Sequence, residues 1–136
     1  MTPQEVREEM KNLEGDPQVA ARRRVVQRQL VMNRLSQAVP KADVVIVNPT
    51  HYAVALTWSR GKGNAPRCVA KGTDEIAARI RERASEAGVP IRRDPPTARA
   101  LFASVEIGRE IRPEHYAAVA AAIRFSDAMR KKARRK

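Results

Sequence analysis

Four consecutive residues that can do chemistry, Asn48-Pro49-Thr50-His51, interrupt an apolar stretch that reads DVVIV before them and YAVAL after them. Asparagine commonly degrades when the backbone nitrogen of the next residue attacks its side-chain carbonyl. Proline has no backbone N–H, so this route is closed at Asn48. The opposite attack remains available, because Asn48 Nδ2 can attack the carbonyl carbon of its own residue. That step closes a succinimide, expels the Pro49 nitrogen and divides the chain between residues 48 and 49.

The surrounding fold must assist such a reaction, since an amide nitrogen is a weak nucleophile. Proximity and orientation supply up to about 7–11 kcal/mol in the best intramolecular reactions. Pro49 restricts its own φ and the conformation of Asn48, so a tight loop can hold the reacting groups near an attack geometry. His51 can move a proton, and Thr50 can hydrogen-bond the loop or polarise the carbonyl. The alternative is an ordinary turn, and the tetrapeptide taken alone favours this alternative.

The flanking segments predict the elements that position the tetrapeptide. The β-branched run DVVIV is typical of a strand covered on both faces, and YAVALTW alternates as a strand with two different faces does. RCVAKG and VPIRRD predict two more short strands. Helices are predicted from a Thr73 cap to Gly88, from PPTARALFASV, and from about Pro113. The predicted fold class is α/β, with a small mixed four-stranded sheet packed with helices and preceded by an extended N-terminal linker helix.

The distribution of charge divides the chain into three predicted parts. Residues 1–39 are rich in arginine and poor in apolar positions, so we expect a linker or stalk helix. Residues 40–126 form the predicted globular domain, which contains the candidate cleavage point. Residues 127–136 form a basic tail, predicted to be disordered because six of the last seven residues are Lys or Arg.

Several classes of function find little support in the composition. The net charge of +12 suggests nucleic-acid binding, but the last seven residues carry half of it and aromatic side chains for stacking are few. Two histidines and one cysteine, Cys68, make no zinc site, and no P-loop or dinucleotide fingerprint is present. We therefore expect no metal, cofactor or small-molecule substrate. Without a signal peptide or an apolar run of about 18–20 residues, the chain is expected to be soluble.

The tetrapeptide and its flanks resemble a known family. KADVVIVNPTHYAVAL is similar to the cytoplasmic domain of the export-switch proteins of flagellar and type III secretion systems, the FlhB/YscU/SpaS family. QEVREEMKNLEGDPQV resembles the membrane-proximal segment of that family, and VPIRRDPPTARALFASVEIGREIRPEHYAAVAAAI resembles its C-terminal half. HYAVAL is more similar to the flagellar branch than to the injectisome branch. The resemblance covers the chain from Met1 to about Ile123.

The resemblance implies that the loop cleaves itself at the Asn–Pro bond through asparagine cyclisation. Asn48 is then the nucleophile and Pro49 the new N-terminus, while Thr50 and His51 complete the loop. The reaction happens once in each molecule, so we expect no turnover enzyme. Cleavage would relax the loop and change which proteins a bacterial export gate accepts, from early rod and hook subunits to later filament subunits.

The resemblance also implies partners and a location. The expected partners are export-gate subunits, the hook-length control protein and exported flagellar substrates, with Tyr52, Arg92 and Arg93 as candidate docking residues. The full-length protein would be anchored in the bacterial inner membrane, with this part on the cytoplasmic face. Two alternatives stay open, namely an uncleaved structural adaptor and a basic nucleic-acid-binding module.

Overall fold

The computed structural model describes residues 15–49, 51–59 and 63–134, and the chain separates into two units, 1–34 and 35–136. The described part of the first unit is helical, because helix α2 (Pro17–Ala38) begins there. Asp16 Oδ1 accepts a hydrogen bond from the Gln18 N–H at 2.9 Å, and a proline suits the first helical position. The predicted linker before residue 15 lies outside the described residues. Within the described ranges, no helix combines the length and apolar character needed to cross a membrane.

The second unit is built on a four-stranded sheet of order β3-β2-β1-β4. Strand β1 (Val44–Asn48) pairs antiparallel with β2 (Tyr52–Thr57), and β2 pairs antiparallel with β3 (Arg67–Thr73). Strand β4 (Ile91–Arg93) pairs parallel with β1. The mixed sheet confirms the predicted fold class. Strand β1 therefore lies inside the sheet, with a neighbour on each side.

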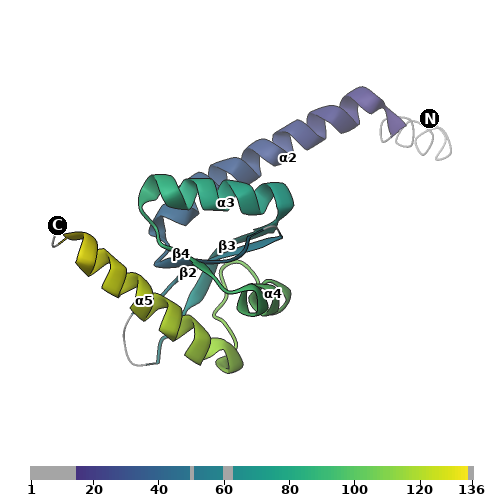
Figure 1. Cartoon of the computed structure of the whole chain (residues 1–136). Coiled ribbons are helices and arrows are strands. Elements are labelled where there is room, and N and C mark those ends of the chain that lie inside the picture. Colours follow the sequence, from purple (N-terminus) through teal and green to yellow (C-terminus); the bar gives the residue numbers. More distant parts are fainter. Residues whose placement is uncertain (1–14, 50, 60–62, 135–136) are drawn as a thin grey trace. The chain divides into compact units, whose positions relative to one another are not determined.

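Helices cover both faces of this sheet (Figure 1). Helix α3 (Asp74–Ala87) packs on one face, and α4 (Pro95–Ser104) and α5 (Tyr116–Arg134) pack on the other. Short 3-10 turns, η1 (Val39–Lys41) and η2 (Pro113–His115), precede β1 and α5. All of Val44–Val47 are buried, since alternate residues of β1 meet the two covered faces. This double burial explains the continuous apolar run in the sequence.

The alternation predicted for β2 is confirmed by the core beneath α4 and α5. Val54 and Leu56 are fully buried there, and Tyr52 and Trp58 pack against the same core. This core also contains Val44, Ile46, Cys68, Ala98, Leu101, Val105, Ile111, Val119, Ala122 and Ile123.

Two helix ends differ from the local sequence pattern. Thr73 occupies the N-cap position of α3, but its side chain makes no capping hydrogen bond. Helix α5 continues to Arg134, whereas composition predicts a disordered tail from residue 127. No glycine or proline follows Pro113, and Ala, Met, Lys and Arg favour helix, so nothing in residues 127–134 interrupts α5. The end of α3 agrees with prediction, because Gly88 adopts the left-handed conformation with φ of 72°.

Candidate functional site

The tetrapeptide forms the tight connection between β1 and β2. Asn48, the last residue of β1, lies opposite Tyr52, the first residue of β2, so the hairpin has a short loop. The His51 N–H donates a hydrogen bond to the Asn48 carbonyl oxygen at 3.0 Å. Thr50 lies outside the described residues, and its predicted role stays a prediction. The turn is thus present, and the reactivity of its Asn48–Pro49 bond depends on the contacts that hold it.

The His51 N–H is hydrogen-bonded to the Asn48 carbonyl, which is the group that asparagine cyclisation would attack. A donor already aimed at a carbonyl oxygen stabilises the negative charge that develops there in a tetrahedral intermediate. Asn48 and Pro49 are half-buried, whereas His51 is exposed. The bond that would break is therefore partly shielded, while the His51 imidazole can exchange protons with solvent.

Helix α3 holds the loop from outside. The Asp74 N–H, at the start of α3, donates to the His51 carbonyl oxygen at 3.1 Å. Arg81 Nη1, from the middle of the helix, donates to the Pro49 carbonyl oxygen at 2.8 Å. Asp74 has a φ of 44°, a left-handed conformation that costs non-glycine residues about 1–3 kcal/mol. A strained backbone therefore occurs where α3 meets the loop.

The segment that follows β4 holds the other side of the loop. The Asp94 N–H donates to the Val47 carbonyl oxygen at 3.0 Å. The Asp94 side chain caps α4, accepting hydrogen bonds from the Thr97 N–H at 3.3 Å and the Thr97 hydroxyl at 2.7 Å. Because the cap fixes Asp94, its amide is a firm anchor for the end of β1.

Four carbonyl oxygens around the candidate scissile bond thus accept hydrogen bonds, those of Val47, Asn48, Pro49 and His51. Sequence reasoning identified none of the external donors. Arg81 lies in a helix of mixed charge, and Asp94 has the pattern of an ordinary helix cap. No local periodicity shows that either residue reaches the loop.

Tyr52 connects the loop to α4. Its ring centroid lies 5.0 Å from that of Phe102 and 6.3 Å from the His51 ring. Lys71 Nζ lies 4.9 Å above the Phe102 ring and donates to the Phe102 carbonyl oxygen at 3.0 Å. The half-buried Tyr52 therefore contributes to packing, and its docking role stays a prediction.

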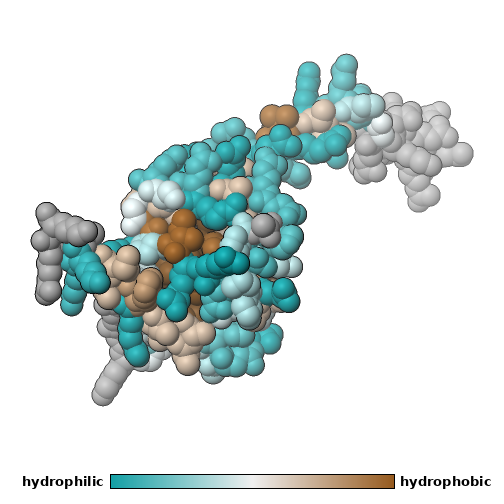
Figure 2. Space-filling model, in the orientation of Figure 1, coloured by the Kyte–Doolittle hydropathy of each residue, from teal (hydrophilic) through white to brown (hydrophobic). Residues whose placement is uncertain are grey.

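The other predicted docking residues lie on β4, the outer strand beside β1. Parallel pairing places Arg93 opposite Val47, one residue before Asn48. The Arg92 guanidinium lies 4.8 Å above the ring of Phe125 on α5. Exposed apolar side chains of this region include Ile91 and Phe125, and Figure 2 shows apolar surface between α3 and α5, where β4 lies. The docking role of Arg92 and Arg93 also stays a prediction.

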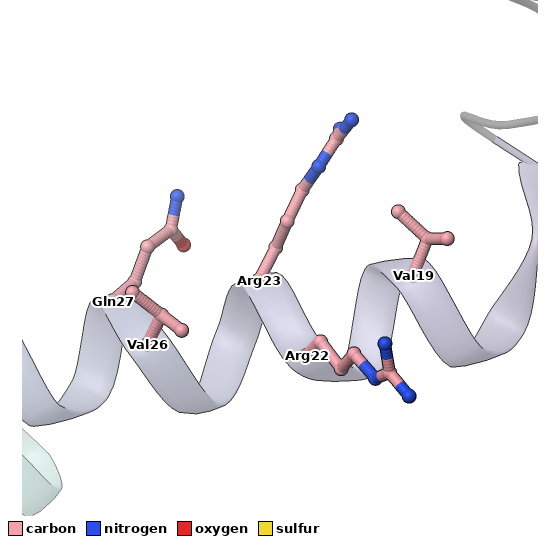
Figure 3. A pocket seen from close by; sticks show the side chains of 5 residues that line it. All are labelled: Val19, Arg22, Arg23, Val26 and Gln27. Carbon is pink, nitrogen blue, oxygen red and sulfur yellow. The ribbon is translucent and has the colours of Figure 1, made fainter.

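Other parts of the structure provide less chemistry. Among the described residues, no group of three or more His, Cys, Asp or Glu side chains could hold a metal ion. A hollow along α2 is lined by Val19, Arg22, Arg23, Val26 and Gln27. Figure 3 shows that Arg22 and Arg23 point away from each other, so they do not converge on one anion.

Burial raises the pKa of the Cys68 thiol to about 11 and keeps it protonated, and Lys71 and a hydrogen bond to Ala70 oppose that shift only in part. Because the thiolate is the reactive form, Cys68 is a structural residue of the core.

The protein is thus an α/β domain in which an anchored Asn-Pro turn connects two buried strands. The chain belongs to the FlhB HrpN YscU SpaS family, whose family model matches residues 1–125. It is 49% identical over 120 residues to flagellar biosynthetic protein FlhB of Salmonella typhimurium, covering 88% of this chain and 31% of that protein. It is 46% identical over 125 residues to FlhB of Aquifex aeolicus, covering 92% and 36%. The chain thus spans about a third of the length of these curated relatives.

Solved structures share the fold. The cytoplasmic domain of FlhB from Shewanella putrefaciens superposes with a TM-score of 0.65 at 37% identity, over 69% of this chain and 78% of that one. A C-terminal domain of EscU with an asparagine-to-alanine substitution also gives 0.65, at 29% identity, over 68% and 92%. The predicted family and fold class are both confirmed.

Proposed function

We propose that this chain is the self-cleaving cytoplasmic domain of a flagellar export-gate component that controls which substrates are exported. The observation that carries the proposal is the turn itself. Its Asn48 carbonyl accepts the His51 N–H, and α3 holds the Pro49 and His51 carbonyls. Donors from outside the turn restrict its conformation further than the hydrogen bond within the turn does.

The reaction is an intramolecular substitution at the Asn48 carbonyl carbon. Asn48 Nδ2 forms a bond to this carbon, and the His51 N–H stabilises the oxyanion that results. The bond to the Pro49 nitrogen then breaks, and a proton lost from Nδ2 is delivered to that nitrogen, with His51 as carrier. The first fragment ends in a succinimide, the second begins with the Pro49 secondary amine, and water later opens the succinimide.

The fold supplies what the weak nucleophile lacks. Four hydrogen-bonded carbonyls restrict the loop before reaction, so little ordering remains to be done in the transition state. The strained conformation of Asp74 lies at one of these anchors. Each molecule reacts once and needs no cofactor, so the domain is a self-processing switch and not a turnover enzyme.

Relatives provide the setting of the proposal. The curated relatives are flagellar biosynthetic proteins, and the solved structures of EscU include variants in which an asparagine or the proline after it was replaced by alanine. We infer that scission relaxes the surface around Asn48 and Tyr52. Export-gate subunits, a hook-length control protein and flagellar substrates would recognise the change. The full-length protein would be anchored in the bacterial inner membrane with this domain on its cytoplasmic side.

Denaturing electrophoresis of purified protein tests the proposal. Wild-type protein should give two bands, and Asn48→Ala should give one intact band. Mass spectrometry at early times should find the first fragment one water lighter than a hydrolysed product. His51→Ala should slow cleavage while the domain remains folded. A single intact wild-type band after prolonged incubation at neutral pH would refute the proposal, and a hydrolysed end at the earliest times would refute cyclisation.

A further inference from the structure

Arg81 differs from the two arginines beside it on α3. Arg79 Nη1 lies 2.7 Å from Glu82 Oε2, and Arg83 Nη1 lies 3.0 Å from Glu86 Oε2, so both form ion pairs within the helix. Arg81 is half-buried and leaves its helix to donate to the Pro49 carbonyl oxygen at 2.8 Å. Its charge is thus directed at the residue that follows the candidate scissile bond.

The contact with Arg81 restricts ψ of Pro49. The pyrrolidine ring fixes φ near –65°, so ψ is the only soft dihedral that remains in this residue. The direction of the Pro49 carbonyl depends on ψ, and Arg81 holds that carbonyl. A hydrogen bond from a charged donor is stronger than one between neutral groups. The leaving residue is therefore held by its own ring and by Arg81.

The carbonyl on the other side of the candidate bond is held as well. The Asn48 carbonyl accepts the His51 N–H, and the His51 carbonyl accepts the Asp74 N–H from the start of α3. Helix α3 therefore anchors both ends of the loop, at the Pro49 carbonyl and at the His51 carbonyl. Displacement of Arg81 would free ψ of Pro49, so the turn could leave the conformation in which the Asn48 carbonyl is held for attack.

We propose that Arg81 is a positioning residue for scission of the Asn48–Pro49 bond. The inference rests on the proposed self-cleavage and names a residue that makes this cleavage efficient. Arg81 touches neither the attacking Nδ2 nor the carbonyl under attack. It acts through the Pro49 carbonyl, so its removal should slow scission and leave the domain folded.

Pulse–chase synthesis of the full chain in a cell-free system measures the rate before cleavage is complete. Arg81→Met, which retains the aliphatic stem, should slow scission by about 10- to 100-fold, since small misplacements cost up to about that factor. Arg79→Met is the matched control on the same helix and should change the rate by less than about twofold. Arg81→Lys retains the charge without the planar fork and should give an intermediate rate.

Chemical rescue separates positioning from a structural role. Millimolar guanidinium should accelerate scission of Arg81→Ala severalfold and leave Arg79→Ala unchanged, because the free ion can occupy the vacated place beside the Pro49 carbonyl. Melting curves in the uncleavable Asn48→Ala background check the fold. Arg81→Met should lower the melting temperature there by no more than about 5 °C.

Each outcome decides the inference. Wild-type cleavage with an equally fast, folded Arg81→Met variant would overturn the role of Arg81 and leave the proposed function intact. Equal slowing by Arg79→Met, or no rescue by guanidinium, would also overturn it. If Arg81→Met fails to fold, a folded Arg81→Lys variant that cleaves at the wild-type rate overturns it instead. An uncut wild-type chain would refute the proposed function and this inference together.

Discussion

Scission between Asn48 and Pro49 would place β1 on one fragment and the rest of the sheet on the other. Strand β1 lies between β2 and β4, and Val44–Val47 are at most 4% exposed. Each such aliphatic side chain contributes about 1.5–3 kcal/mol when it is buried, so these four contribute about 6–12 kcal/mol. We therefore predict that the cut protein remains a complex of its two fragments.

The cost of the cut follows from the loss of the tether. A short connection holds β1 at an effective concentration in the millimolar range. At about 10 µM protein, losing this advantage of about 10²–10³-fold lowers stability by about 3–4 kcal/mol. This is less than the burial of β1 contributes, so the fragments should separate only when the domain unfolds.

The assay is the concentration dependence of melting, with uncut Asn48→Ala as the control. Each tenfold dilution of the cut protein costs about 1.4 kcal/mol, which lowers the melting temperature of a domain of about 100 residues by about 6 °C. The melting temperature of Asn48→Ala should not depend on concentration. Two results would contradict the central position of β1. One is separation of the wild-type fragments on native size exclusion, and the other is a melting temperature of the cut complex that does not change on dilution.

Two further predictions concern the core around the site. Gly72→Ala would place a Cβ in overlap with the Ile76 side chain and should destabilise the domain by about 1–3 kcal/mol in urea titrations. Gly15→Ala, whose Cβ would meet open space, is the control and should be nearly neutral. Equal stability of the two variants would refute the close approach of Ile76 to Gly72. Burial raises the pKa of the Cys68 thiol from 9.0 to about 11, so the folded state keeps the proton that the unfolded state releases. Stability should be unaffected below pH 9 and should fall by about 2–3 kcal/mol between pH 9 and 11. Cys68→Ala should lack this part of the decline, and an identical decline in both proteins would show that Cys68 is not the cause.

Much of the fold could be predicted from local sequence. The β-branched run before Asn48 and the alternation after Tyr52 predict the hairpin, because side-chain period and burial are properties of short segments. Gly88 predicts the end of α3 through its tolerance of positive φ. The predicted cap at Thr73 and the predicted disordered tail from residue 127 were less accurate. The Thr73 side chain makes no capping hydrogen bond, and residues that favour helix continue α5 to Arg134.

The sequence by itself determined which intramolecular route is open at the candidate bond: proline closes deamidation through the following nitrogen and leaves attack of the Asn48 carboxamide on its own main-chain carbonyl. Only the tertiary structure decided how that bond is held. Arg81 and Asp94 lie far along the chain from Asn48, and they reach the loop because α3 crosses the sheet and β4 returns parallel to β1. Such contacts depend on the packing of distant segments, which no local pattern of residues encodes.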